Sequence, residues 1–393
     1  MSGDARFDIV VIGGGIVGCA SAFWLARRGL KVALVERAGI AQGTTGNSFA
    51  WINGTSKTAD ERYHRLNALG AAIYRELCAE FGEDRLGLNP SGMLKLVSRR
   101  DEAAYAATRE QAARLAAFGY PGTCWVGNAE LAAMEPHLAL PGDVEALYAM
   151  ADACLDAPAF ARFMAQQVRE MGSQVLEECA ARTLEMSDDG AITAVLTDQG
   201  RLATPRVLVS AGPGTAEVLS ELTGYDGFAA RFPLNRVPGL LVVTPSTSPR
   251  RLVRRVLYMA GGDEFHVLPT PDGGLKVGAD DTDGMVAEDA TPQRMREAAR
   301  ILLERTRAWL PAFEGEACLD RCRIGIGVRP YPQDGKTLAG ELPGSRGLFV
   351  IATHSGVTLS PAVGRLMADL IADGRTPDAL APFGLERFQA FAG

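Results

Sequence analysis

The stretch Asp8-Ile-Val-Val-Ile-Gly-Gly-Gly-Ile-Val-Gly18, continued by a helix-forming run to Arg28 and by Lys31-Val-Ala-Leu-Val-Glu36, decides the fold. Its β-branched apolar run predicts a buried parallel strand, and the run after Gly18 predicts a helix. A second strand is expected to end at Glu36. This order of strand, glycine turn, helix and strand predicts a Rossmann-like βαβ unit.

Each residue type in this unit has a physical role. Gly13 permits a tight turn, Gly15 lets the backbone approach a pyrophosphate, and Gly18 lets the helix pack on the strand. The amino terminus of the helix offers N–H groups and a positive dipole end to phosphates. Glu36 can accept hydrogen bonds from ribose hydroxyls, which suits FAD or NAD better than NADP. An ordinary glycine-rich turn is the alternative, but the context favours a dinucleotide site.

Three later segments bear on the choice between FAD and NAD. The loop 43–48, Gly-Thr-Thr-Gly-Asn-Ser, is rich in small donors that can wrap a long cofactor, although it can also be a plain flexible loop. Segment 206–214 predicts a strand that ends in small residues, where a backbone or a ligand can come close, followed by a helix over 215–222. Segment 347–364 predicts a strand, a glycine-bearing loop, and a helix that begins near Ser360 or Pro361, with Ser360 as its cap. The amino terminus of that helix can stabilise negative charge.

With these motifs in place, the chain resembles the D-amino-acid oxidase superfamily, which includes glycine oxidase, sarcosine oxidase and D-amino-acid dehydrogenases. The matching motifs are Gly13-Gly-Gly-Ile-Val-Gly18 with Glu36, the loop 43–48, Ser210-Ala-Gly-Pro-Gly214, Gly327-Val-Arg-Pro330 with Asp334-Gly335, and His354-Ser-Gly-Val-Thr-Leu-Ser-Pro361. They extend from the first strand to the last helix. Their combination is specific for the superfamily and not for one member.

The resemblance implies an α/β fold. A Rossmann-like FAD-binding domain is expected from the discontinuous segments 1–85, 150–225 and 320–393. An α+β substrate-binding domain with an antiparallel sheet is expected from 86–149 and 226–319. Within these ranges the patterns predict a strand over 91–98, helices over 101–118, 158–171 and 292–310, with Thr291 as a candidate cap of the last helix, and a hairpin turn at Pro271-Asp-Gly-Gly274.

Composition narrows the class of protein further. The 393 residues carry a formal net charge of −7 without a basic stripe, so nucleic acid is not an expected partner. Apolar runs are too short to span a membrane, and the start does not resemble a signal peptide, which favours a cytoplasmic protein. Seven scattered cysteines without a CxxC pair argue against a disulfide framework or a metal site.

The expected cofactor is FAD, and the resemblance implies which residues contact it. They are Gly13, Gly15, Ile16, Val17, Gly18, Glu36, Arg37, Thr44, Thr45, Asn47, Ser48, Ala181, Ala211, Gly212, Gly327, Arg329, Ser355, Gly356, Val357 and Thr358. Some relatives carry a covalently linked histidine at the place of Asn47, so non-covalent binding is expected here.

The expected reaction transfers hydride from the carbon beside an amine, in an amino acid or secondary amine, to flavin N5. The imine product then hydrolyses, and oxygen or another acceptor reoxidises the flavin. In the resembling oxidases the arginine of the G-x-R-P segment holds the substrate carboxylate, which implies this role for Arg329; a guanidinium fork suits it. A structural salt bridge is the alternative for Arg329.

Further catalytic candidates are His354, at the closing loop, and His266 and Tyr258, on strands of the substrate domain. Strand alternation puts Glu264, His266 and Leu268 on one face, which can turn toward the flavin. The alternative for His354 is a loop histidine bonded to the backbone, and for His266 and Tyr258 it is ordinary packing or surface exposure. Two other functions stay open: oxidation of a small hydroxy acid with a histidine base, and a flavin-binding subunit of a larger complex.

Overall fold

The structure is a computed structural model that describes residues 6–224, 228–247, 251–262, 264–388 and 391. The chain divides into two compact units. Unit 1 comprises Met1–Gly46, Ala157–Val237 and Val328–Gly393, and unit 2 comprises Asn47–Asp156 and Pro238–Gly327. These boundaries differ from the expected domain boundaries near 85, 150, 225 and 320. The assignment of one domain to FAD and the other to substrate stays a prediction.

Unit 1 is an α/β unit. Its elements are β1 (Ile9–Ile12), α1 (Ile16–Arg27), β2 (Val32–Val35), α6 (Ala157–Glu170), β9 (Gln174–Leu176), β10 (Ala181–Met186), β11 (Ile192–Thr197), β12 (Gly200–Ala203), β13 (Val207–Val209), α7 (Thr215–Thr223), α8 (Phe228–Arg231), β19 (Leu338–Glu341), β20 (Leu348–Ala352) and α11 (Gly356–Asp373). Short 3-10 turns cover Thr44–Asn47, Gly212–Gly214, Ala381–Phe383 and Leu385–Arg387.

A six-stranded sheet in the order β19-β20-β13-β1-β2-β9 forms the middle of unit 1. All neighbouring strands are parallel except β19 and β20. Every residue of β1, β2, β13 and β20 is buried, which explains their continuous apolar sequences. β1 lies between β2, which follows it in the chain, and β13, which comes much later. The carboxyl end of such a strand is where open α/β sheets bind ligands.

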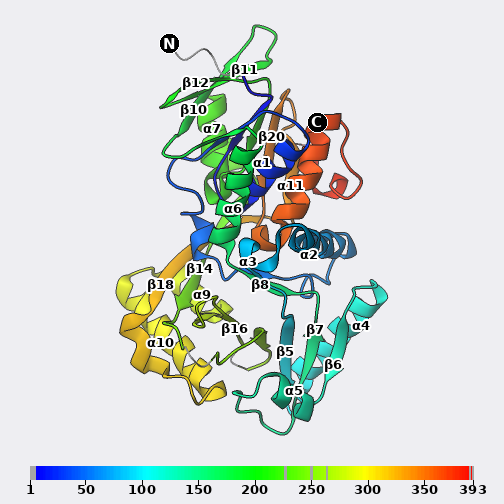
Figure 1. Cartoon of the computed structure of the whole chain (residues 1–393), viewed down its shortest axis with the longest axis vertical. Helices are drawn as coiled ribbons and strands as arrows, with labels where there is room; N and C mark the ends of the chain where they lie inside the picture. The colour runs from blue at the N-terminus through cyan, green and yellow to red at the C-terminus, as the bar shows by residue number, and fades with distance from the viewer. Residues whose placement is uncertain (1–5, 225–227, 248–250, 263, 389–390, 392–393) are drawn as a thin grey trace. The chain divides into compact units, whose positions relative to one another are not determined.

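The layers around this sheet follow from strand alternation. Val10, Ile12 and their neighbours face a core shared with α7 and the three-stranded antiparallel sheet β10-β11-β12. Helices α1, α6 and α11 pack together, with α1 in contact with both others (Figure 1). A side chain at Gly364 would lie 3.0 Å from the backbone of Ala20, so glycine allows α11 to lie directly on α1.

The expected start of the last helix, near Ser360 or Pro361, is wrong. Helix α11 begins at Gly356 and contains Pro361, and it ends before Gly374 in a left-handed conformation, as the sequence indicates. Pro361 has no N–H to donate to the carbonyl of Val357. The Ser360 hydroxyl donates to that carbonyl instead, at 3.4 Å, so the helix continues through the proline.

Unit 2 contains the remaining elements. They are β3 (Trp51–Ile52), α2 (Glu61–Phe81), α3 (Glu83–Leu86), β4 (Leu88–Asn89), β5 (Met93–Ser98), α4 (Glu102–Ala117), β6 (Thr123–Val126), α5 (Asn128–Met134), β7 (Val144–Ala149), β8 (Ala153–Leu155), β15 (Val256–Met259), β16 (Phe265–Pro269), β17 (Leu275–Gly278), α9 (Asp280–Glu288) and α10 (Pro292–Trp309), with a 3-10 turn at Gly315–Arg321. Strands β14 (Leu234–Val243) and β18 (Arg323–Pro332) run through the unit boundaries.

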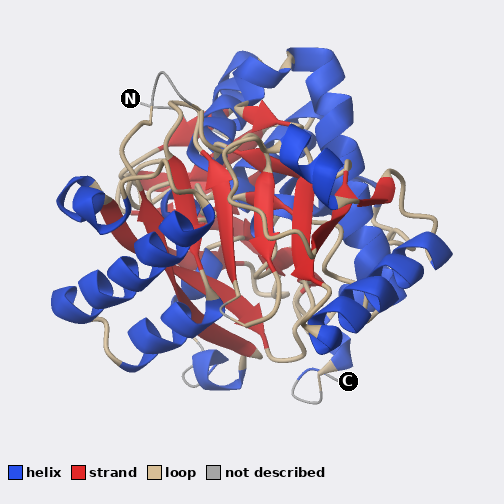
Figure 2. Ribbon diagram, turned by 90° about the horizontal axis from the view of Figure 1, so that it is seen from below, coloured by secondary structure: helices blue, strands red, loops and turns tan. Residues whose placement is uncertain are grey.

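Several predictions made from local sequence patterns are confirmed in unit 2. The expected helix over 292–310 is α10, and the Thr291 hydroxyl accepts a hydrogen bond from Arg294 N as its cap. The turn at 271–274 joins β16 and β17 in antiparallel pairing. Both strands belong to an eight-stranded sheet with the order β18-β14-β17-β16-β15-β5-β7-β6, and helices lie against this sheet (Figure 2). The pair β5 and β15 is parallel, so the sheet is mixed and not purely antiparallel.

The two faces of the eight-stranded sheet differ in chemistry. Leu257, Val267 and Val277 lie in register and join the apolar core that includes α10 residues such as Leu302. The residues one step along each strand point to the opposite face. There Lys95, Tyr258 and His266 lie side by side in register on β5, β15 and β16.

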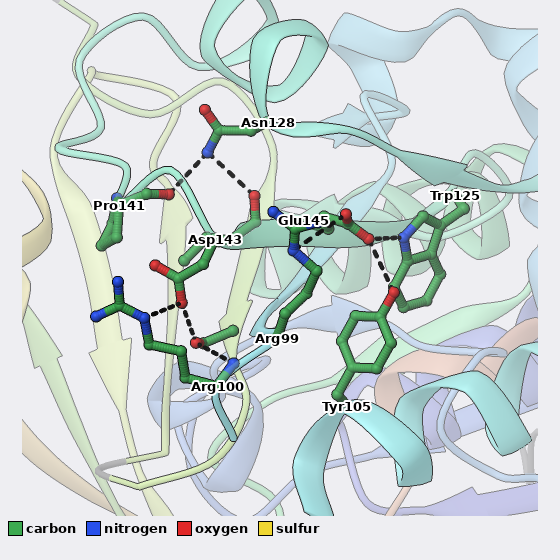
Figure 3. A network of polar contacts seen from close by, with 10 residues as sticks. Arg99, Arg100, Tyr105, Trp125, Asn128, Pro141, Asp143 and Glu145 are labelled. Carbon is green, nitrogen blue, oxygen red and sulfur yellow. Dashed lines mark hydrogen bonds and ion pairs between the residues drawn. The ribbon is translucent and has the colours of Figure 1, made fainter. Parts of the chain in front are cut away.

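A polar network fastens α4 to the outer strands of this sheet (Figure 3). Glu145 on β7 accepts hydrogen bonds from Tyr105 of α4, at 3.0 Å, and from the indole of Trp125 on β6. Arg99 lies 3.6 Å from the same carboxylate. The hydrogen bond from Trp125 is the main cause that lowers the pKa of Glu145. The carboxylate of Glu145 has all of these partners within the network, so we interpret the network as structural.

None of the helices in the described part of the chain is both long and apolar enough to cross a membrane. The cytoplasmic location stays a prediction.

Candidate functional site

Two glycines of the opening turn are required by the packing of the protein itself. Gly13 has φ of +114°, and a side chain there would lie 2.3 Å from the carbonyl oxygen of Ser210. A side chain at Gly18 would lie 1.9 Å from the carbonyl oxygen of Gly13. The first turn of α1 therefore lies directly on the end of β1, as the sequence predicts.

Gly15 is different, because little in the protein demands a glycine there. Its backbone is extended, with φ of −74°, and the nearest atom to an added Cβ is Thr45 Oγ1 at 3.4 Å. Gly15 is the N-cap of α1, and Thr45 Oγ1 accepts a hydrogen bond from Ile16 N at 3.0 Å. The open space at Gly15, beside a positive helix end, is what a bound pyrophosphate requires.

Glu36 is held at the carboxyl end of β2. Its carboxylate accepts hydrogen bonds from Gly14 N at 2.7 Å and Ala38 N at 2.9 Å, which leaves lone pairs for ribose hydroxyls. A surface pocket beside it is lined by Arg37, Ala38, Gly39, Gln42, Glu177 and Glu178. The acid and the pocket fit the adenosine end of a dinucleotide.

The segment after β13 meets the glycine turn. Ser210 N donates to the carbonyl of Ile12 at 2.8 Å, and Gly212 adopts a positive φ of +58°. Ala211 and Gly212 therefore follow directly on the strand end beside β1. Ala181 lies at the start of β10, where it pairs with Thr197 of β11.

The amino terminus of α11 lies against that of α1. A side chain at Gly356 would be 3.2 Å from Cγ2 of Val17. Ser355 is the N-cap of α11, and its N–H donates to Thr353 Oγ1 at 3.2 Å. Ser355, Gly356, Val357 and Thr358 thus form a second positive helix end next to the first. Two such ends suit a cofactor that carries phosphates and an electron-rich ring.

The loop that contains Thr44 and Asn47 is divided between the units. The Thr44 hydroxyl donates to the carbonyl of Val328 at 2.6 Å, within unit 1. Asn47 and Ser48 belong to unit 2, where Asn47 Oδ1 accepts a hydrogen bond from Arg323 at 3.0 Å. A side chain at Gly327 would lie 2.4 Å from the carbonyl oxygen of Asn47, which explains this glycine by backbone packing.

Arg329 lies on β18 between two contacts to the predicted cofactor segments. Val328, just before it, accepts the hydrogen bond from Thr44. Tyr331, two residues later and on the same side of the strand as Arg329, stacks on His354 with ring centres 4.3 Å apart. Tyr331 was missed in the sequence analysis, which predicted no strand over this segment.

His266 and Tyr258 are brought together in unit 2. Their rings are stacked with centres 4.6 Å apart and planes 15° apart. The Tyr258 hydroxyl donates to Glu264, and burial is the main cause that raises the pKa of this phenol. His266 Nδ1 lies 3.3 Å from the carbonyl oxygen of Gly278. Their orientation toward a flavin stays a prediction.

Other residues on this face were not indicated by any pattern in the sequence. The rings of Phe49 and Trp51 lie 5.8 and 5.9 Å from that of His266, and the Lys95 ammonium lies 5.0 Å from the Tyr258 ring centre. Lys276 donates to the carbonyl of Ser48 at 3.4 Å. Burial lowers the pKa of both lysines. These contacts depend on tertiary structure, so no local sequence pattern predicts them.

Comparison with known proteins identifies the family. The family of FAD dependent oxidoreductases (DAO) matches residues 8–370. Glycine oxidase of Geobacillus kaustophilus (strain HTA426) is 27% identical, over 97% of this chain and 97% of that protein. The crystal structure of glycine oxidase from Geobacillus kaustophilus superposes with a TM-score of 0.78 at 24% identity, covering 98% of this chain and 99% of that chain. L-Proline dehydrogenase from P. horikoshii superposes with a TM-score of 0.79 at 20% identity, covering 98% of this chain and 97% of that chain. The residues of unit 1 fit FAD, and the chain belongs to the DAO family of FAD-dependent oxidoreductases.

Proposed function

We propose that this enzyme oxidises a small amino acid or secondary amine at the carbon beside its nitrogen, giving an imine that hydrolyses. Arg329 carries the proposal, because its neighbours on β18, Val328 and Tyr331, contact the loop of Thr44 and the ring of His354. Both segments belong to unit 1 together with the opening glycine turn. A guanidinium there is suited to a substrate carboxylate. The curated relatives that match over most of this chain include proteins named glycine oxidase, which supports an amino-acid substrate.

We assign a separate role in this reaction to each candidate residue. The bound FAD supplies the hydride-accepting ring. Arg329 holds the carboxylate and thereby fixes which carbon is presented. Tyr331 stacks on His354 and restrains its ring at the start of α11. His266 and Tyr258, which stack on each other in unit 2, are further candidate catalytic residues. Because the substrate amine needs only to be neutral, no protein nucleophile is required.

A substrate screen without oxygen tests this function. We expect the absorbance of oxidised flavin to be lost with at least one compound from a panel of glycine, sarcosine, D- and L-amino acids and cyclic imino acids. Hydroxy acids of matching size serve as the comparison. A flavin that only hydroxy acids reduce would favour the alternative chemistry, with His354 or His266 as base. A flavin that none of these compounds reduces would count against both.

The mode of FAD attachment gives a separate prediction. Asn47 occupies the loop position at which some relatives have a flavin-linked histidine, and an amide is not a nucleophile. We therefore expect acid precipitation to leave all of the FAD in the supernatant, as judged by its absorbance. Yellow colour retained in the washed protein pellet would contradict non-covalent binding. The electron acceptor, oxygen or another, is decided by following reoxidation of the reduced enzyme with each.

A further inference from the structure

Two cysteines of unit 2, Cys318 and Cys322, lie side by side. Their Sγ atoms are 3.6 Å apart, and either sulfur can donate the hydrogen of this contact. Cys318 is buried in the 3-10 turn Gly315–Arg321, and Cys322, the residue after that turn, is half-buried. All seven cysteines of the chain are free in the structure. Two free thiols in direct contact can react with each other once one of them is oxidised.

Each of the two thiols also has a backbone acceptor. Cys318 Sγ donates to the carbonyl of Gly315 at 3.2 Å, and Cys322 Sγ donates to the carbonyl of Cys318 at 3.3 Å. If Cys318 loses its proton, the Cys322 thiol can turn from its carbonyl to the new thiolate. This hydrogen bond between the two side chains is the main cause that lowers the pKa of Cys318. The thiolate is the reactive form of cysteine, so the contact favours reaction.

The turn that carries Cys318 is held to helix α10 of the same unit. Glu316 N donates to the carboxylate of Glu304 at 2.9 Å, and Arg296 pairs with Asp320 at 2.6 Å. The Cys318 side chain itself belongs to the apolar core that includes residues of α10. These contacts, on both sides of Cys318 in the chain, fix the position of its sulfur.

Cys322 is held by the start of β18. Its N–H donates to the carbonyl of Leu319 at 3.2 Å, and its backbone is extended, with φ of −77° and ψ of 142°. The next residue, Arg323, donates to Asn47 Oδ1 at 3.0 Å, also within unit 2. Because both sulfurs are fixed, each meets the other at a high effective concentration. A disulfide bond is about 2 Å long, so rotation of the side chains must bring the sulfurs about 1.5 Å closer.

We propose that Cys318 and Cys322 form a redox pair, which a peroxide converts into a disulfide and a dithiol converts back into two thiols. The half-buried side chain of Cys322 gives a small peroxide access to the pair. This inference goes beyond amine oxidation and does not depend on it, because it concerns a separate site within unit 2.

The reaction of the pair consumes one peroxide and yields one disulfide. The thiolate of one cysteine attacks a peroxide oxygen, the O–O bond breaks, and the sulfur becomes a sulfenic acid with release of hydroxide. The second sulfur attacks the sulfenic sulfur, forms the S–S bond and releases a second hydroxide. The protons of the two thiols convert both hydroxides into water, and two electrons pass from the pair to the peroxide. A dithiol reverses the change by thiol–disulfide exchange, in which the dithiol is oxidised.

The experiment adds hydrogen peroxide to the purified FAD-containing protein and removes the excess with catalase. Free thiols are then alkylated in denaturant and counted by mass spectrometry. We expect the protein to lose two of its seven free thiols and to regain both after treatment with dithiothreitol. Trypsin cleaves after Arg321, between the two cysteines, so the disulfide is observed as two joined peptides. Their mass is lower by two hydrogen atoms than the sum of the reduced peptides.

Three variants identify the pair. Cys318→Ser and Cys322→Ser should each abolish the joined peptides, because each leaves one sulfur without its partner. Cys124→Ser removes an exposed thiol on β6 and is the matched control, in which the joined peptides should form as in the wild type. The melting temperature of each variant reports whether it is folded. If the buried Cys318→Ser variant fails to fold, the half-buried Cys322→Ser variant decides.

Three results would overturn the inference. The first is a peroxide treatment that oxidises Cys124 but leaves Cys318 and Cys322 as thiols. The second is a disulfide that joins either of them to another cysteine. The third is a loss of the two thiols that dithiothreitol does not reverse, which indicates oxidation beyond the sulfenic acid. Since the peroxide is added, none of these results depends on whether the enzyme oxidises amines.

Discussion

Gly15→Val is expected to give a folded protein that no longer retains FAD. The extended backbone at Gly15 accepts any residue, and an added Cβ meets only Thr45 Oγ1 at 3.4 Å. The branched side chain would instead occupy the space where the pyrophosphate approaches the amino terminus of α1. Loss of about two hydrogen bonds to charged oxygens costs about 4 kcal/mol, or about a thousandfold in affinity. Flavin content after purification and FAD titration measure the effect.

Two further glycine variants make this result interpretable. Gly127 is the N-cap of α5, with φ of −76° and ψ of 164°, close to the −74° and 176° of Gly15, and its surroundings are open. Gly127→Val should therefore keep both the fold and the FAD. Gly18→Val should instead prevent folding, because its Cβ would overlap the carbonyl of Gly13. Wild-type FAD affinity in a folded Gly15→Val protein would show that the turn does not hold the phosphates.

The sequence predicts this turn well because all of its signals are local. Strand β1, helix α1 and the cap of α10 at Thr291 each follow from residues within one turn or one strand of each other. The start of α11 does not follow from neighbouring residues in this way, because Ser360 and Pro361 form a pattern that is typical of a helix start. Only the structure shows that the Ser360 hydroxyl satisfies the carbonyl that Pro361 leaves free.

The contacts of the candidate site that the sequence did not predict all join residues that are far apart in the chain. The bond from Thr44 to Val328 joins residues 284 apart in sequence, and the bond from Trp51 to Asp152 joins residues 101 apart. Side-chain period and turn chemistry describe neighbours in the chain, so they carry no information on such pairs. The resemblance to a known family made Arg329 and His354 candidates, whereas the stacking of Tyr331 on His354 is visible only in the fold.

Arg329→Ala is expected to lower kcat/KM about a thousandfold for carboxylate-bearing amines. The guanidinium fork can make two charged hydrogen bonds to a carboxylate, together worth about 4 kcal/mol. The corresponding amine without a carboxylate should be oxidised equally slowly by wild type and variant. Arg329→Lys keeps the charge but loses the fork, so we expect an intermediate loss of about tenfold. Anaerobic stopped-flow reduction of the flavin, at several substrate concentrations, separates binding from the chemical step.

Arg321→Ala is the matched control for this series. Arg321 also pairs with a carboxylate, that of Glu314, but it is exposed at the end of a 3-10 turn in unit 2. Removing an exposed ion pair should change stability by less than about 1 kcal/mol and leave catalysis intact. If Arg329→Ala instead impaired amines with and without a carboxylate to the same degree, or lost FAD and melting temperature together, Arg329 would be a structural residue of β18. The carboxylate would then have to be bound by another cation, and the amino-acid specificity proposed for this enzyme would lose its main support.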